Sequence, residues 1–84
     1  MSARQKAVKA PKMYLKTGKD AVVLRKKLGQ NQTKFWGRIA TTQSGGSRYE
    51  GGRRLPGTVQ FLLHLAYAPD AQAQAMLEYL RTRD

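Results

Sequence analysis

The sequence predicts an all-α fold, a compact domain of five short helices. Apolar residues recur at intervals of three and four along most of the chain, which is the spacing of one face of an α-helix. Capping residues precede these segments, and glycine or proline follows several of them. No segment alternates polar and apolar residues as a half-buried strand does, and 84 residues suit one domain.

A basic arm precedes the first expected helix. Residues 1–16 carry five Lys or Arg and no acid, and Pro11 interrupts them. We expect this arm to be partly flexible, with residues 13–15 able to dock on the core. Residues 17–84 are expected to form the domain itself.

The first two helices have clear start signals. Thr17 and Asp20 have the spacing of a capping box, and Gly29 suits the end of the helix that they begin. Asn31 can cap a second helix of about two turns. Their apolar faces are expected to consist of Ala21, Leu24 and Leu28 in the first helix and of Phe35, Trp36 and Ile39 in the second.

A third helix follows after a tight connection. Thr42 can cap it, and it is expected over residues 43–50. Gly51 or Gly52 is expected to end it.

Two prolines delimit the last two helices. Pro56 suits the first turn of the fourth helix, and Pro69 separates it from a fifth that Asp70 can cap. The fourth helix is expected to bury Val59, Leu62, Leu63, Ala66 and Tyr67 and to carry a second stripe of Phe61 and Leu65. The fifth is expected to bury Ala73, Met76, Leu77 and Leu80.

The charge is strongly positive and unevenly distributed. The net charge is +11, and residues 1–54 hold 14 of the 16 Lys and Arg but only 2 of the 5 acids. A one-sided basic field favours a polyanionic partner, usually nucleic acid, although a merely soluble basic protein stays open as the alternative. Cysteine is absent, and no apolar run reaches transmembrane length, so we expect a cytoplasmic, nucleoid-associated protein without a membrane partner.

The stretch LGQNQTKFWGRIATTQSGGSRYEGGRRLP resembles the helix-turn-helix of the phage repressor and Cro-like (XRE-type) DNA-binding family. The resemblance covers roughly residues 21–67. The residues that carry it are Gln32, Phe35, Ile39, Thr42, Gln43, Ser44, Tyr49, Glu50, a following glycine and Pro56. It implies a lambda-repressor-like domain whose helix-turn-helix core lies at about residues 31–51. The third expected helix, over residues 43–50, is then the one that lies in the major groove of DNA.

The third helix carries the side chains expected to read bases. The resemblance assigns base readout to Thr42, Gln43, Ser44 and Arg48, and helical spacing adds Ser47 on the same face. Gln can bond an adenine edge, Arg a guanine edge, and the Thr methyl group can contact thymine. The alternative is a solvated polar face.

Phosphate contacts are expected around this helix. Asn31 and Gln32 lie at the start of the second helix, where free N–H groups favour an anion, and Arg53 and Arg54 follow the reading helix. Lys34 and Arg38 are weaker candidates. The basic arm either tracks the DNA or serves as a solubilising tail.

Two structural pairings and one strained turn are also expected. The resemblance implies an ion pair between Arg25 and Glu50, which is the only acid between Ala21 and Pro69. Trp36 stands where the family has a small residue, and Gly46 stands where it has Ile or Val, so we expect the Trp36 ring to cover the glycine pair Gly45–Gly46. At position 40 the family commonly has a glycine with positive φ, so Ala40 is either strained or in a different turn.

These observations predict a sequence-specific double-stranded DNA-binding regulator of bacterial or phage type. The expected form is a small repressor that binds an inverted-repeat operator as a homodimer. The surplus apolar residues of the last two helices could supply the dimer interface or simply pack within one chain. An RNA-binding protein and an antitoxin-type protein-interaction regulator stay open as alternatives.

An enzyme is not expected. The single histidine, His64, lies on an apolar helix, where we expect a surface or interfacial residue rather than a base. The five acids form no pair at helical spacing, and no phosphate-binding loop motif is present. We expect no cofactor, no metal and no small-molecule substrate.

Overall fold

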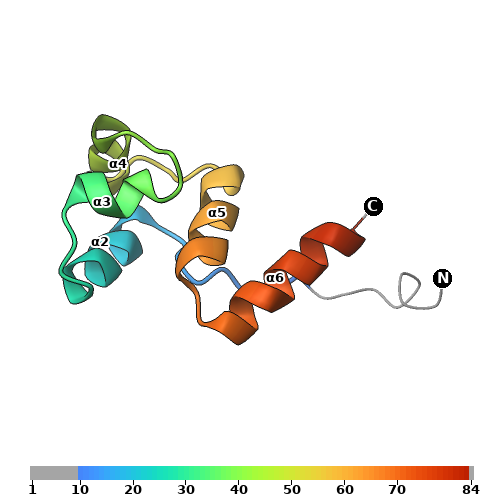
Figure 1. Ribbon diagram of the computed structural model, residues 1–84. Helices are drawn as coiled ribbons and strands as arrows, with labels where there is room; N and C mark the ends of the chain where they lie inside the picture. The colour runs from blue at the N-terminus through green and yellow to red at the C-terminus, as the bar shows by residue number, and fades with distance from the viewer. Residues whose placement is uncertain (1–9, 84) are drawn as a thin grey trace.

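The computed structural model describes residues 10–83, and this part of the chain is entirely helical apart from its connections (Figure 1). The helices are α2 (Gly18–Lys27), α3 (Gln32–Gly37), α4 (Gln43–Glu50), α5 (Gly57–Tyr67) and α6 (Asp70–Thr82). The predicted all-α class with five helices is therefore confirmed for residues 10–83. The part of the predicted basic arm at residues 1–9 lies outside the described residues.

The helices form a body with one projecting end. α2, α3 and α4 gather at one side, where α4 packs against both α2 and α3, and α5 stands beside them (Figure 1). α6 packs mainly on α5 and leads away from this body (Figure 1). The helix-turn-helix therefore lies at the opposite end of the molecule from the end of α6.

The core is centred on two aromatic residues of α3. Phe35 and Trp36 are fully buried, and the surrounding core residues are Leu15, Ala21, Ile39, Leu55 and Leu63. The Phe35 ring stacks on the Tyr67 ring at 4.4 Å between centroids, and the Tyr67 hydroxyl donates to the Phe35 carbonyl at 2.6 Å. α5 therefore holds α3 by both an aromatic stack and a hydrogen bond, and Leu15 joins the segment before α2 to the same core.

Three predicted helix starts are confirmed and a fourth is wrong. The Thr17–Asp20 capping box is formed at α2. Asn31 accepts the Lys34 N–H, and Thr42 accepts the Gly45 N–H, so α3 and α4 are capped as predicted. Asp70, however, is the first residue of α6 and makes no capping bond, because Pro69 occupies the cap position.

Three helices end in the same type of turn. After α2, the Gly29 N–H bonds the Lys26 carbonyl and the next N–H bonds the Arg25 carbonyl, with Gly29 at φ +68°. This is the Schellman motif, and it recurs after α4 with Gly52 at φ +117°. After α3 the equivalent position is Ala40, at φ +61°. The turn therefore has the expected positive-φ geometry, and Ala40 adopts a backbone conformation that costs about 1 kcal/mol or more in a residue with a Cβ.

Three leucines expected on buried faces are exposed. Leu28 is 47% exposed, Leu62 46% and Leu77 40%. Leu28 lies beyond the last turn of α2, where the chain is already turning away. Leu62 and Leu77 lie about 100° around their helices from Leu63 and Met76, which are the residues that are fully buried.

The expectation that His64 is a surface residue or lies at an interface with another chain is wrong, because its side chain is completely buried within the fold. The Tyr14 backbone N–H donates to His64 Nδ1 at 3.1 Å, and Nε2 lies 3.0 Å from the Gln72 carbonyl, which can only accept. Nδ1 therefore accepts one hydrogen bond, and Nε2 is the donor to the Gln72 carbonyl. The ring joins the segment before α2 to α5 and α6.

The strain at Ala40 gives a first prediction. Replacing Ala40 by Gly removes the steric penalty of positive φ, which outweighs the added freedom of the unfolded chain. We expect the Ala40→Gly variant to gain about 0.5–1 kcal/mol in free energy of unfolding, measured by urea denaturation. Gly29→Ala introduces the same strain after α2, so its free energy of unfolding should be about 1 kcal/mol lower than that of the wild type. A destabilised Ala40→Gly variant would show that the turn at residue 40 is not strained.

Candidate nucleic-acid interface

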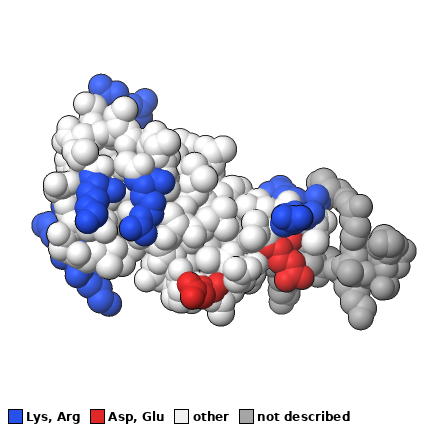
Figure 2. Space-filling view, viewed as in Figure 1, with Lys and Arg blue, Asp and Glu red and all other residues white. Residues whose placement is uncertain are grey.

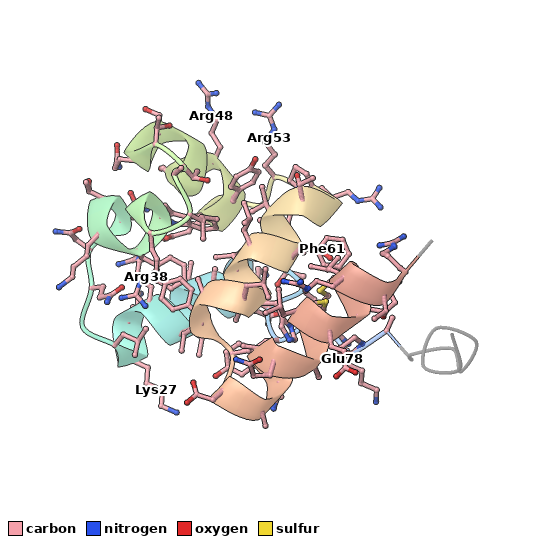
Figure 3. The ribbon with its side chains drawn as sticks, turned by 45° about the vertical axis from the view of Figure 1, so that its right-hand side comes forward. Lys27, Arg38, Arg48, Arg53, Phe61 and Glu78 are labelled. Carbon is pink, nitrogen blue, oxygen red and sulfur yellow. The ribbon has the colours of Figure 1, made fainter. Side chains whose placement is uncertain are left out.

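The polar side chains of α4 form an exposed face. Gln43, Ser44, Ser47 and Arg48 are exposed, as is the capping residue Thr42, whereas Gly46 is buried. In Figure 3, Arg48 extends away from the body of the molecule. The residues expected to read bases therefore share the solvent side of one helix.

The first of these residues is held by α3. Gln43 Nε2 donates to Gln32 Oε1 at 2.6 Å, and Gln32 Nε2 in turn donates to Glu50 Oε1 at 3.0 Å. One N–H and the carbonyl oxygen of the Gln43 amide stay available for a base edge. Each end of the Gln32 amide makes one of these two bonds, so the second Nε2 N–H and the backbone N–H remain for the expected phosphate contact.

The starts of α3 and α4 open on a common hollow of about 550 Å³. It is lined by Arg25, Asn31, Gln32, Thr33 and Gln43. Asn31 uses its side-chain oxygen to cap α3, which leaves its amide N–H groups free for an acceptor in the hollow. Thr33 was not among the expected site residues, because a threonine in a first helical turn has no distinctive sequence signal.

Basic side chains surround the exposed face of α4. Arg53 and Arg54 are exposed in the loop after α4, and Arg48 and Arg53 extend on the same side in Figure 3. Lys34 is exposed on α3. Arg38 lies 4.9 Å over the Tyr67 ring, whose pKa is raised by burial against the opposing effect of the Arg38 charge.

The described surface carries Lys and Arg at both ends of the molecule, whereas the acidic side chains visible in Figure 2 lie at one end only. Figure 2 shows Lys and Arg spread over the part formed by α2, α3 and α4. The Asp and Glu side chains visible in this view lie over the part formed by α5 and α6. An approaching polyanion is therefore steered towards the end that carries α4.

The Glu50 carboxylate is the centre of the polar contacts beneath this face. Arg25 donates from Nε to Oε2 at 2.8 Å and from Nη2 to Oε1 at 2.9 Å. Trp36 Nε1 donates to Oε2 at 2.8 Å, and Gln32 donates to Oε1, so each oxygen accepts two bonds. The Glu50 side chain is only 7% exposed and that of Arg25 16%. Arg25 also donates to the Gln30 carbonyl at 3.0 Å, which fixes the turn between α2 and α3.

The pKa of Glu50 reflects these contacts. Burial by itself raises this pKa, but the hydrogen bonds from Arg25, Trp36 and Gln32, together with the Arg25 charge, hold it below its ordinary value. The carboxylate is therefore ionised in the folded protein at neutral pH, and it contributes stability in that form.

The Trp36 ring covers one glycine of the pair, not both. A Cβ at Gly46 would overlap Cδ1 and Cγ of the buried Trp36 ring. A Cβ at Gly45 would instead meet the side chains of Thr41 and Thr42 at 3.2 and 3.3 Å. The expectation that Trp36 covers Gly45 is therefore wrong, because Gly45 lies about 100° around α4 from Gly46.

Gly18 is a further close contact that the sequence did not indicate. Its position is buried, and a Cβ there would overlap the Tyr49 carbonyl of α4. The start of α2 thus touches the backbone at the end of α4. A glycine after a helix cap looks ordinary in a sequence, and only the approach of a distant segment reveals its role.

The packing of Trp36 on α4 gives a second prediction. Gly46→Ala forces the Trp36 ring or α4 to move, and overpacking of this kind costs about 1–3 kcal/mol. Gly45→Ala is the matched control in the same helix, and its free energy of unfolding should stay within about 1 kcal/mol of the wild type because helix propensity rises. Both are measured by urea denaturation. Equal stability of the two variants would contradict the Trp36–Gly46 contact.

The lowered pKa of Glu50 gives a third prediction. Glu50→Gln leaves Arg25 without its counter-charge, and at pH 7 we expect a loss of about 3–5 kcal/mol. A carboxylate with a lowered folded pKa contributes its stability above the unfolded value and loses it as pH falls through the folded value. The difference between wild type and variant should therefore shrink below about pH 4.5. Glu78→Gln on exposed α6 is the control, and a pH-independent difference at Glu50 would refute the assignment.

Residues 10–83 bring no three His, Asp or Glu side chains together in a group that could hold a metal ion. None of the helices described is long and apolar enough to cross a membrane.

Comparison with known proteins identifies the family. A family model for the RsaL-like HTH domain matches residues 22–66, which is more than half of the chain and runs from α2 to the last turn of α5. Searches of curated proteins and of solved structures each found no match. The narrower resemblance to the phage repressor and Cro-like domains stays a prediction. The chain belongs to the RsaL-like helix-turn-helix family, and it is a DNA-binding transcription regulator of the helix-turn-helix class.

Proposed function

We propose that the protein is a sequence-specific repressor that inserts α4 into the major groove of an inverted-repeat operator. The observation that supports this best is the chain of hydrogen bonds from Gln43 through Gln32 to the buried Glu50. It fixes the first reading side chain before any ligand binds, so less conformational entropy is lost on binding. Side chains that only contact solvent would gain nothing from being held in one conformation.

Each side chain of the α4 face has a chemical role in this proposal. The Gln43 amide bonds an adenine edge, Arg48 bonds guanine in a bidentate manner, and the Thr42 methyl group contacts thymine. Ser44 and Ser47 accept or donate to a base edge or a neighbouring phosphate. All five are exposed, which base contact requires.

Phosphate contacts hold α4 in register. Asn31 and the Gln32 backbone bind on one side of the groove through the hollow at the start of α3. Arg53 and Arg54 bind on the other side, and Lys34 adds a peripheral charge.

A homodimer completes the proposal, because an inverted repeat is matched by a two-fold protein. Met76 is fully buried within the chain, so it cannot supply the interface that the sequence suggested for it. Phe61 is half-buried and lies between α5 and α6 in Figure 3. The exposed Leu62 and Leu77 and the half-buried Leu65 and Leu80 remain for a second copy. Occupation of a promoter by such a dimer excludes other proteins, which is the reason for proposing repression.

Selection from a random pool of DNA duplexes tests this function. We expect enrichment of an inverted repeat with half-sites about ten base pairs apart. Gln43→Ala and Arg48→Ala should each weaken binding to that site by about 1–3 kcal/mol and relax its sequence at one position. Gln74→Ala and Arg81→Ala, which remove the same residue types from exposed positions on α6, are the matched controls. No enriched duplex, or preferential binding of RNA, would overturn the proposal.

A further inference from the structure

A second hollow lies beside the end of α4, with cationic residues around a mostly apolar lining. It measures about 260 Å³, many times the space of one water molecule. The start of α2 forms one wall and the loop between α4 and α5 forms the other. Its lining residues are Lys16, Thr17, Gly18, Lys19, Gly52, Arg53, Arg54 and Leu55. Four of these eight residues are cationic and none is acidic.

The two walls of this hollow, the α2–loop hollow, are joined by specific contacts. Gln60 Nε2 donates to the Lys16 carbonyl at 3.3 Å and to the Leu55 carbonyl at 3.4 Å, one on each wall. Leu55 is only 3% exposed, which anchors the loop in the core. The contact between Gly18 and the Tyr49 carbonyl then fixes the α2 wall against the end of α4.

Part of the backbone at the α2 wall is already hydrogen-bonded. The Asp20 carboxylate accepts the Lys16 and Thr17 N–H groups at 3.0 and 3.2 Å. The Lys16 and Thr17 N–H groups are therefore not available to an incoming ligand, which meets the side-chain cations of this wall instead. Within residues 10–83, neither Lys16 nor Lys19 forms a salt bridge with an acid. Both are exposed, so their charges are available to a ligand.

We propose that the α2–loop hollow binds a backbone phosphate of the same duplex that α4 reads, with Lys16 and Lys19 as DNA contacts. The proposal rests on the proposed function and extends it. Arg53 connects the two regions, since it lines the hollow and extends on the same side as Arg48 in Figure 3. Arg53 and Arg54 offer planar, bidentate bonds to phosphate oxygens, and the two lysines add point charges. The duplex contact thus continues past the end of the reading helix onto α2.

The double variant Lys16→Gln/Lys19→Gln tests this in the full chain. Binding to the selected duplex is measured between about 50 and 200 mM salt. The hollow is proposed to hold one phosphate, so losing this contact should reduce the slope of log K against log salt by about 0.9 and weaken binding several-fold. The enriched sequence should stay the same, because phosphate contacts carry no base information. Thermal unfolding should be unchanged, since both side chains are exposed.

A matched control distinguishes the loss of a contact in the hollow from the effect of lowering the net charge of the protein. Arg81→Gln/Arg83→Gln removes two cations from exposed positions at the end of α6 and should leave the slope unchanged within error. Duplexes with one methylphosphonate at a time then locate the contact. One neutralised phosphate should weaken the binding of the wild type more than that of the Lys16/Lys19 variant.

The outcomes distinguish the hollow from the reading function. The lysine variant and the α6 control could show the same salt slope while Arg48→Ala lowers the sequence preference of binding. The phosphate contact in the hollow would then be refuted, and base reading by α4 would stand. If the wild type binds duplexes without sequence preference, base reading by α4 is refuted. The comparison of salt slopes then still tests whether the hollow binds a phosphate. If the wild type binds no duplex but binds RNA or an acidic peptide, both proposals fall.

Discussion

The rest of the structure depends on the carboxylate of Glu50. A buried charge is costly unless it is paired and fully hydrogen-bonded, and here Arg25, Gln32 and Trp36 together direct four donors to its two oxygens. These donors come from α2 and α3, and the acceptor belongs to α4. One ion therefore sets the relative rotation of three helices, and with it the direction in which the exposed face of α4 points.

Trp36 serves both the packing and the polar contacts of this arrangement. Its ring occupies the space beside Gly46, and its N–H satisfies the carboxylate. α4 itself has weak helix propensity, because two adjacent glycines lie in its interior. The helix is thus maintained by contacts from outside, which are the Trp36 ring, the Glu50 bonds and the Gly18 approach. A short helix with little intrinsic stability can in this way present a rigid face.

The same contacts explain how a small domain combines exposure with order. In the proposed function the base-reading side chains must be solvent-exposed, and exposed side chains are normally free to change rotamer. Gln43 is restrained because Gln32 holds its amide, and Gln32 is restrained because Glu50 holds it in turn. The basic residues around this face produce a positive field that acts over longer distances and, in the proposed function, attracts the duplex to the end of the molecule where the ordered side chains lie.

The sequence by itself determined the helices, three of their caps and the side chains of the α4 face, because helical periodicity and capping depend on residues three or four positions apart. The resemblance to a helix-turn-helix family pointed to Arg25 and Glu50, which lie too far apart for any local rule. Tertiary structure alone decided that His64 is buried, that Leu62 and Leu77 are exposed, and that Gly18 and Gly46 must lack a Cβ while Gly45 need not. It also brought Lys16 and Lys19 beside Arg53. Each of these depends on which distant segment covers a residue, and that is set by packing between helices, whereas sequence patterns report only the face on which a residue lies.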